Sequence, residues 1–226
     1  MKNILIVGSS KGIGLEMVKI LSKDNHVIAI SRHTDNLKSL INESNLTVWT
    51  LDISQENIKA QLINQFELFN KKIDIVINNA GYLVNKPLLE QTRQDIENQF
   101  LTNTIGIIQV CQAVIPFMNA NGHIVNIGSM GGFQGSSKFT GLSAYSASKA
   151  AIASFTECLA EELKDLNIQA NCLALGAVQT EMLAEAFPGY EAPVSANKMA
   201  EFITDFSLNA NQWVNGKVIP VSLSTP

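Results

Sequence analysis

Short apolar runs rich in β-branched residues alternate with segments of helical periodicity along most of this chain, and the alternation constrains its fold more than any other feature. The runs predict these strands, most of them too continuously apolar to have a face in water: Asn3–Val7, His26–Ser31, Thr47–Leu51, Ile73–Ile77, His123–Ile127, Ile168–Leu173 and Lys217–Val221. The helical segments between them are Gly12–Lys23, Asn57–Phe69, Asp95–Met118 and Ala144–Leu166. The pattern predicts an α/β fold in which crossover helices cover a buried parallel sheet.

The composition fits one globular domain. The chain has 226 residues, of which 46% are hydrophobic and 16% are charged, so it can bury a substantial core and is neither disordered nor collagen-like. We therefore expect a single domain over residues 1–226. The formal net charge of −4 is the opposite of the basic excess that binds nucleic acid or anionic lipid, so we expect neither partner.

Cysteine usage and apolar run lengths indicate where the protein resides. Cys111, Cys158 and Cys172 are odd in number and far apart, so they form neither a disulfide framework nor a zinc spacing. The histidines are equally scattered, and we expect no metal site. The first apolar run, Ile4 to Val7, is too short for a signal peptide, and we expect no window of about 18 apolar residues that could span a bilayer. These features predict a cytoplasmic protein.

Polar residues or glycines follow the carboxyl ends of most of the predicted strands. These segments are Gly8-Ser9-Ser10, Ser31-Arg32, Asp52, Asn78-Asn79-Ala80-Gly81, Gly128-Ser129 and Gly176. In open α/β sheets the ligand crevice lies outside the carboxyl ends of the strands. We therefore expect these segments to converge on one site.

The segment from Gly8 to Gly14 follows the first strand and opens the first helix. It reads Gly8-Ser9-Ser10-Lys11-Gly12-Ile13-Gly14. Glycines at such a place permit a tight turn, close approach of the backbone to a pyrophosphate and close packing of helix on sheet, with the phosphates on the helix N-terminus. The position favours nucleotide binding over a purely structural turn.

The end of the second strand distinguishes NAD from NADP. A carboxylate there would bind the ribose hydroxyls, whereas an arginine accommodates the 2′-phosphate. This chain has Ser31-Arg32, with a second cation, Lys11, in the glycine segment. We predict NADP, the alternative being that both cations are ordinary surface charges. Asp52 ends the third strand and either contacts the adenine edge or caps a loop or helix.

Tyr145 and Lys149 are four residues apart in a predicted helix, so their side chains share a face. A neighbouring ammonium favours the phenolate, and the charge of an oxidised nicotinamide would add to that effect, bringing a phenol toward acid–base work near neutral pH. Ser129 ends the fifth strand beside the expected crevice, where its hydroxyl could hold a substrate oxygen. The alternatives are a solvated helix face and a simple turn serine.

Asn103 lies on the apolar face of the helix predicted over Asp95–Met118. A buried amide must find hydrogen-bond partners. It either anchors a proton relay that reaches Lys149 or is a structural amide bonded to the backbone.

Together these residues resemble the short-chain dehydrogenase/reductase family, of the NADP-preferring type, along about the whole chain. The resemblance is carried, in order, by Gly8-x-x-x-Gly12-x-Gly14, Asn78-Asn79-Ala80-Gly81, Asn103, Ser129 and Tyr145-x-x-x-Lys149. It implies a Rossmann fold with strand order 3-2-1-4-5-6-7, an NAD(P) cofactor, and a homodimer or homotetramer. It also implies that Tyr145 is the catalytic acid/base, that Lys149 binds the nicotinamide ribose and lowers the tyrosine pKa, that Ser129 orients the carbonyl and that Asn103 completes the proton relay.

The expected cofactor contacts come from the strand ends and from this resemblance. They are Gly8, Ser10, Lys11, Gly12, Ile13, Gly14, Ser31, Arg32, Asp52, Ile53, Asn79, Ala80, Gly81, Tyr145, Lys149, Gly176, Val178 and Thr180. Leu175 stands where the family usually has proline, and a short substrate loop is expected around residues 177–197.

The resulting hypothesis is an NADPH-dependent reductase that converts a small-molecule carbonyl to an alcohol, reversibly. Two alternatives stay open. A sensor or scaffold protein of the same fold would bind NADP without turnover and would have no chemical need for an activated phenol. An epimerase or dehydratase would need a sugar-nucleotide domain, for which 226 residues leave little room.

Overall fold

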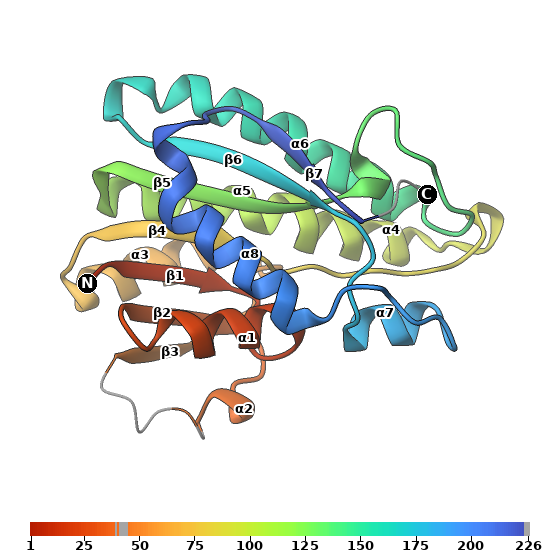
Figure 1. Ribbon diagram of the computed structural model, residues 1–226, viewed down its shortest axis with the longest axis horizontal. Helices are drawn as coiled ribbons and strands as arrows, with labels where there is room; N and C mark the ends of the chain where they lie inside the picture. The colour runs from red at the N-terminus through yellow and green to blue at the C-terminus, as the bar shows by residue number, and fades with distance from the viewer. Residues whose placement is uncertain (39, 41–44, 224–226) are drawn as a thin grey trace.

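Within residues 1–38, 40 and 45–223, which the structure, a computed structural model, describes, seven parallel strands form one sheet (Figure 1). The strand order is β3-β2-β1-β4-β5-β6-β7. The strands are β1 Asn3–Val7, β2 His26–Ser31, β3 Leu46–Thr50, β4 Ile73–Asn78, β5 Met118–Ser129, β6 Gln169–Leu175 and β7 Val218–Val221. The predicted doubly wound parallel sheet and its strand order are therefore confirmed.

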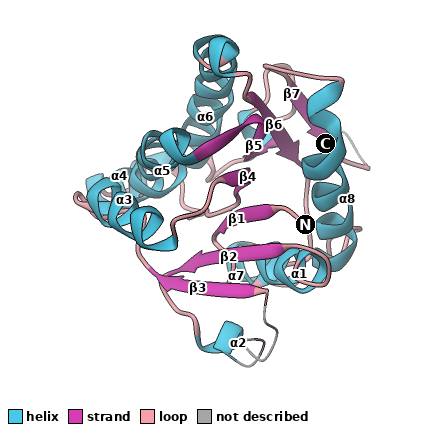
Figure 2. Cartoon of the chain, turned by 90° about the vertical axis from the view of Figure 1, so that its left-hand side faces the viewer, coloured by secondary structure: helices cyan, strands magenta, loops and turns pink. Residues whose placement is uncertain are grey.

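Helices cover both faces of the sheet and make three layers, as the end-on view in Figure 2 shows. One face carries α1 (Gly12–Leu21) and α8 (Ala196–Asn209), which pack on each other. The other face carries α3 (Ile58–Phe69), α4 (Arg93–Phe100), α5 (Gly106–Val114) and α6 (Ser143–Glu162). Two short helices, α2 (Asp35–Lys38) and α7 (Glu181–Ala186), follow the carboxyl ends of β2 and β6.

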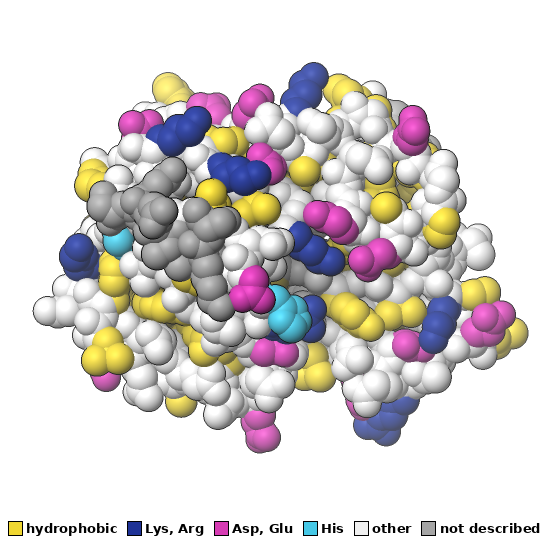
Figure 3. Space-filling model, turned by 90° about the horizontal axis from the view of Figure 1, so that it is seen from below, with side chains coloured by type: hydrophobic (Ala, Val, Ile, Leu, Met, Phe, Trp, Pro, Cys, Tyr) yellow, Lys and Arg dark blue, Asp and Glu magenta, His cyan; other side chains and the backbone are white. Residues whose placement is uncertain are grey.

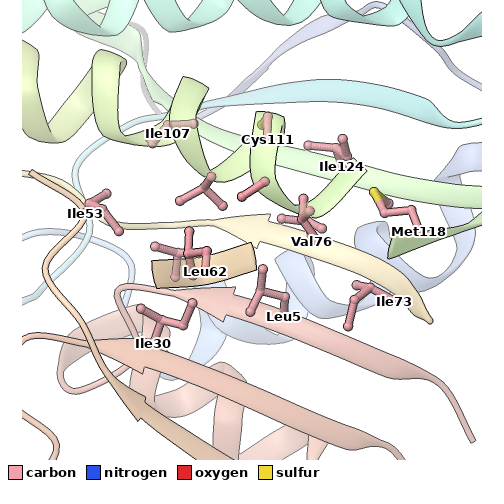
Figure 4. Packing of buried hydrophobic residues seen from close by; sticks show 14 of the residues in the cluster. Leu5, Ile30, Ile53, Leu62, Ile73, Val76, Ile107, Cys111, Met118 and Ile124 are labelled. Carbon is pink, nitrogen blue, oxygen red and sulfur yellow. The ribbon is translucent and has the colours of Figure 1, made fainter. Parts of the chain in front are cut away.

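The strands are apolar on both faces because both faces are covered. Along β1, Leu5 packs into the cluster beneath α3 and α5, whereas its neighbour Ile4 packs into the cluster beneath α1 and α8. Figure 4 shows the first cluster, in which Leu62 of α3 and Ile107 of α5 meet Val76 of β4. The tightly packed sheet fixes the carboxyl ends of its strands relative to one another.

The sequence did not predict every element. The first two strands have the predicted boundaries, and those of the others shift by one or two residues, except that β5 begins five residues earlier than expected, at Met118. The helix α8 was missed, although Ser195 caps its N-terminus and Met199, Ile203 and other buried residues recur at helical spacing. The segment expected as a substrate loop contains α7.

The helix predicted over Asp95–Met118 is interrupted. A π-helical turn, η2 (Leu101–Ile105), separates α4 from α5, and a 3-10 turn, η3 (Ile115–Phe117), follows. The π turn contains Asn103, and such turns are frequent at functional sites. The turn at Leu101–Ile105 therefore gives Asn103 a local backbone that periodicity alone could not show.

The same helical run, Arg93–Phe117, is the one helix of the described residues long and apolar enough to cross a membrane, with a mean hydropathy of 1.5. The sequence analysis had expected no such stretch. In the structure the run packs against α3, α6 and the neighbouring turns, and 44% of its most apolar window is buried. Core helices of globular domains meet the same criterion, so length and composition alone are weak grounds for a membrane span.

Candidate active site

A cavity of about 1050 Å³ opens at the carboxyl ends of the strands. All but two of the predicted site residues line it; the exceptions are Asn103 and Gly14. The lining residues from the prediction are Gly8, Ser10, Lys11, Gly12, Ile13, Ser31, Arg32, Asp52, Ile53, Asn79, Ala80, Gly81, Ser129, Tyr145, Lys149, Gly176, Val178 and Thr180. The sheet thus brings together side chains from nearly the whole length of the chain.

The glycine segment wraps the first turn of α1. Gly8 has a φ of +83°, and a Cβ there would lie 2.5 Å from the Cα of Ala80. Gly14 is buried away from the cavity, and a Cβ on it would overlap the carbonyl oxygen of Gly8. Gly14 therefore serves the packing of the turn, and the prediction that it contacts a cofactor directly has no support in its position. Asn79 closes the arrangement by donating from Nδ2 to the Gly8 carbonyl over 2.7 Å.

The N-terminus of α1 suits a phosphate. The residue before it, Lys11, provides no side-chain cap, so the side chain at that position does not satisfy the first backbone N–H groups of the helix. Such groups, with the positive end of the helix dipole, bind anions. The residues present therefore fit the pyrophosphate of a dinucleotide.

Ser31 and Asp52 hold loops as well as lining the cavity. The Ser31 hydroxyl accepts hydrogen bonds from the backbone N–H groups of Ser9 and Ser10, at 3.0 and 3.1 Å. The Asp52 carboxylate accepts from the backbone and hydroxyl of Ser54, at 2.9 and 2.7 Å. The structure thus shows the loop-capping role that the sequence had left open for Asp52.

The two predicted cations lie at the mouth of the cavity. Arg32 is exposed and also lines a small neighbouring hollow with Thr50 and Asp52. The ammonium of Lys11 lies 3.9 Å from the carboxylate of Glu185 on α7. On the face in Figure 3, basic side chains are dispersed among acidic ones. The positive charge at the cavity mouth is therefore local.

Ser129, Tyr145 and Lys149 converge on the inner part of the cavity. Ser129 ends β5, and its hydroxyl accepts from the backbone N–H of Gly131 over 3.1 Å and interacts with the Tyr145 hydroxyl. Lys149, one helical turn after Tyr145 on α6, donates from Nζ to the carbonyl oxygen of Ile127 over 2.8 Å. A phenol, an alcohol and an ammonium thus line one side of the same cavity.

Burial shifts the pKa values of both titratable groups. It raises the pKa of the Tyr145 phenol, and the hydrogen bond with Ser129 only partly opposes the rise. Burial also lowers the pKa of the Lys149 ammonium to about 8. The spacing had predicted a lowered tyrosine pKa, with Lys149 and the charge of an oxidised nicotinamide both favouring the phenolate; among the groups of the chain itself, desolvation raises the pKa instead. Tyr145 is therefore a protonated phenol at neutral pH.

Asn103 is fully buried, and its amide binds other groups than Lys149. Its Oδ1 accepts from the backbone N–H of Tyr82 over 2.7 Å, and its Nδ2 donates to the Tyr82 carbonyl over 2.8 Å. Nδ2 also donates to the Ser148 hydroxyl over 2.9 Å, and that hydroxyl donates to the carbonyl of Tyr145. The structural role left open for this amide is thus present, and it ties α6 to the loop after β4.

The outer part of the cavity is apolar. Its wall includes the exposed side chains of Phe139 and Tyr190 together with Leu83, Leu142, Leu183 and Phe187, whereas Met182 lies farther in, near Gly81 and Lys149. Leu175 ends β6 in register with Ser129 and Val221, so Gly176 still reaches the cavity without the usual proline before it. The Thr180 hydroxyl accepts from the backbone N–H of Leu183 over 3.3 Å and begins α7. The helix α7 therefore forms a wall of both the polar and the apolar parts.

Sequence reasoning missed a buried polar ladder behind the site. Asn78 donates to the Oδ1 of Asn126 over 2.8 Å, and Asn126 donates to the Thr156 hydroxyl over 2.8 Å. The ladder joins β4, β5 and α6 beneath the cavity. The polar residue in the apolar run of β5, Asn126, was the signal that could have revealed it.

Three comparisons with known proteins agree with this geometry. The sequence profile of the family described as short chain dehydrogenase matches residues 2–191. An oxidoreductase of Botryotinia fuckeliana, BOA17, is 32% identical over 182 residues, covering 78% of this chain and 65% of that protein. The chain thus spans just under two thirds of the length of that relative. Carbonyl reductase family member 4 of Xenopus laevis is 32% identical over 185 residues, covering 80% of this chain and 77% of that protein.

A solved structure, described as ElxO with NADP bound, shares the fold across both chains. It superposes with a TM-score of 0.85 at 27% sequence identity, and the match covers 98% of each chain. In this chain the carboxyl ends of the seven-stranded sheet surround the cavity described above.

Proposed function

Because this chain belongs to the short-chain dehydrogenase family, whose members are nicotinamide-dependent oxidoreductases, we propose that it uses NADPH to reduce a carbonyl group of a small molecule to an alcohol, reversibly. One observation carries the proposal. Ser129, Tyr145 and Lys149 line the same cavity as the glycine segment. A dinucleotide that lies along the carboxyl ends of the strands would therefore bring its nicotinamide to the phenol.

The residues of this chain supply the proton and the polarity. A bound nicotinamide supplies the hydride, which goes to the carbonyl carbon. Tyr145 gives its proton to the carbonyl oxygen, and its raised pKa keeps that proton in place at neutral pH. Ser129 donates a hydrogen bond to the same oxygen as negative charge develops on it. In the reverse direction the phenolate accepts the proton of the alcohol.

Lys149 and Asn103 position these groups. The Lys149 ammonium is held by the Ile127 carbonyl at 2.8 Å, and it favours the phenolate that forms once the proton has left. We also propose that it binds the nicotinamide ribose. Asn103 fixes α6 against the loop after β4 through Ser148 and Tyr82. We propose that its part in the proton relay is to hold Lys149 and Tyr145 in register.

The preference for NADPH rests on the cations at the cavity mouth. At the end of β2 the residue after Ser31 is Arg32 and not a carboxylate, although Asp35 and Asp52 also line the cavity. An arginine at this place can bind a 2′-phosphate through charge-assisted hydrogen bonds. The neighbouring Lys11 adds a second positive charge.

The test is a paired fluorescence titration with NADPH and NADH, followed by absorbance assays with a panel of aldehydes, ketones and quinones. The apolar outer wall makes aromatic and aliphatic carbonyl compounds the first members of that panel. Preferential NADPH binding with turnover of any member is the expected result. Tight NADPH binding without turnover across the panel would favour a binding protein over an enzyme, and no binding would overturn the proposal.

A further inference from the structure

The helix α7 is held at its C-terminal end by a residue far away in the sequence. Asn85, in the loop between β4 and η1 (Leu88–Glu90), donates from Nδ2 to the carbonyl oxygen of Ala186 over 2.8 Å. The next residue, Phe187, lines the outer, apolar part of the cavity together with Leu183 of α7. The hydrogen bond thus fixes the part of α7 that covers the proposed substrate side.

The loop that carries Asn85 is itself firmly anchored. The backbone N–H of Val84 donates to the Oε1 of Gln99 over 3.1 Å, and Tyr82 is bound at both backbone atoms by Asn103. Both amide side chains are fully buried on α4 and the π turn. The backbone of the loop just before Asn85 is therefore held in place by buried side chains.

A third segment meets Asn85 at the same point. The backbone N–H of Lys86 donates to the carbonyl of Gly141 over 3.1 Å. Gly141 has a φ of +86°, and a Cβ there would overlap the Oδ1 of Asn85. In Figure 1 the loop after β4, the loop before α6 and α7 all lie beyond the same end of the sheet. Asn85 thus joins three segments around the substrate side.

A second contact of α7 across the cavity is an ion pair near the same end of the helix. Lys11 and Glu185 are 3.9 Å apart, and their side chains are 54% and 74% exposed. Exposed ion pairs contribute little, and salt screens them. The Asn85 hydrogen bond is exposed as well, but it is a short contact to the backbone of α7. The N-terminal end of α7 faces the cofactor side, since Thr180 and Glu181 lie against Gly12, and these contacts do not depend on Asn85.

We propose that Asn85 is a positioning residue for the reaction, which holds the C-terminal end of α7 closed over the substrate. The kinetic part of this inference rests on the proposed function. Loss of the hydrogen bond allows that end to open, so part of the binding energy of the substrate is spent on closing it. The cofactor, bound against the other end of α7, is unaffected.

The experiment compares Asn85→Ala and Asn85→Asp with the wild-type protein. Aspartate matches asparagine in shape but has no N–H to donate, and its charge repels the Ala186 carbonyl oxygen, so both variants should release α7, the aspartate variant at least as much as the alanine variant. The control is Asn98→Ala, since the Asn98 side chain lies on α4 and accepts from the Gln94 amide of the same helix. Hydrogen exchange is measured at the backbone amides of residues 183–190. Steady-state kinetics are measured with a carbonyl compound that the panel of aldehydes, ketones and quinones identifies as a substrate.

For both Asn85 variants we expect exchange in residues 183–190 to accelerate about fivefold, and KM for the carbonyl to rise by a similar factor. The kcat and the Kd for NADPH should each change by less than about twofold. Unchanged exchange in both variants, or a fall in kcat with KM constant, would overturn the role of Asn85. Hydrogen exchange can be measured without turnover. If the wild-type protein were inactive, the proposed function would fail, but the exchange measurement would still decide whether Asn85 holds α7.

Discussion

The middle and the carboxyl end of β5 lie beside buried titratable side chains in opposite situations. In the middle of the strand His123 is 1% exposed, and hydrogen bonds to other parts of the chain enclose it. At the carboxyl end Ser129 lies beside Tyr145 and Lys149 of α6, and all three face a cavity. Burial shifts pKa values at both places. A shifted pKa alone therefore does not mark a reactive group, and what distinguishes the two places is access to a cavity.

The partners of His123 fix its protonation state. The Asn171 side chain accepts from the Lys217 backbone at Oδ1 and donates to the Val214 carbonyl at Nδ2, so its orientation is settled. The same Nδ2 lies 3.0 Å from the Nε2 of His123, which must therefore accept, while Nδ1 donates to the carbonyl of Ser207 over 3.0 Å. The imidazole is neutral and joins β5, β6 and α8.

Removal of the phenol at the carboxyl end should have the largest effect. Tyr145→Phe keeps the buried ring but loses the proton that the proposed reaction transfers. We expect carbonyl turnover to fall about 10²- to 10⁴-fold, with little change in the Kd for NADPH. Single-turnover kinetics and fluorescence titration measure the two quantities. Turnover at the wild-type rate would show that another group supplies the proton.

Much of this site could be predicted from the sequence because the strands are recognisable as continuous apolar runs. Runs such as Ile4 to Val7 are apolar on both faces, and each leads directly to its polar end. Parallel pairing then brings Gly8 and Ser129 to the same edge of the sheet. The residues at strand ends and on α6 were thus found from position and spacing together with the family resemblance.

The remaining features depend on contacts that no local pattern encodes. Asn85 meets Ala186 across 101 residues, and His123 meets Asn171 across 48. The reversed pKa shift of Tyr145 follows from burial, which spacing cannot give. By contrast, α8 had a readable signal in its Ser195 cap and was overlooked.

Acid should destabilise the protein through His123 in the middle of β5, whereas above the ordinary histidine pKa the neutral imidazole keeps its hydrogen bonds. Burial lowers the pKa of His123 from 6.5 to about 4, so below pH 6.5 the unfolded chain binds a proton that the folded chain does not. The free energy of unfolding should therefore fall by about 3 kcal/mol as the pH drops from 6.5 to 4. Urea denaturation across this range measures the loss.

The variant His123→Gln isolates that contribution, because an amide does not titrate. The variant should be less stable than the wild type at neutral pH but should lose less stability on acidification. The comparison is needed because burial and Lys71 also lower the pKa of His26. His26 is present in both proteins, so its contribution to the loss of stability cancels in the difference between them. Parallel curves for the two proteins would show that His123 is not the group that titrates.

Of these three changes, the smallest effect is expected from the exposed Arg32 at the carboxyl edge of the sheet, because solvent weakens its electrostatic interactions, whereas His123 and Tyr145 are buried. Arg32→Asp removes the cation proposed to bind the 2′-phosphate and adds a carboxylate that can bind ribose hydroxyls instead. We expect the ratio of NADPH to NADH affinity to fall about tenfold at low salt, and less at high ionic strength. Lys59→Asp makes the same charge change at an exposed position of α3 and serves as the control. If both variants lowered the ratio equally, net charge would account for the preference; if neither did, Arg32 would have no part in choosing the cofactor.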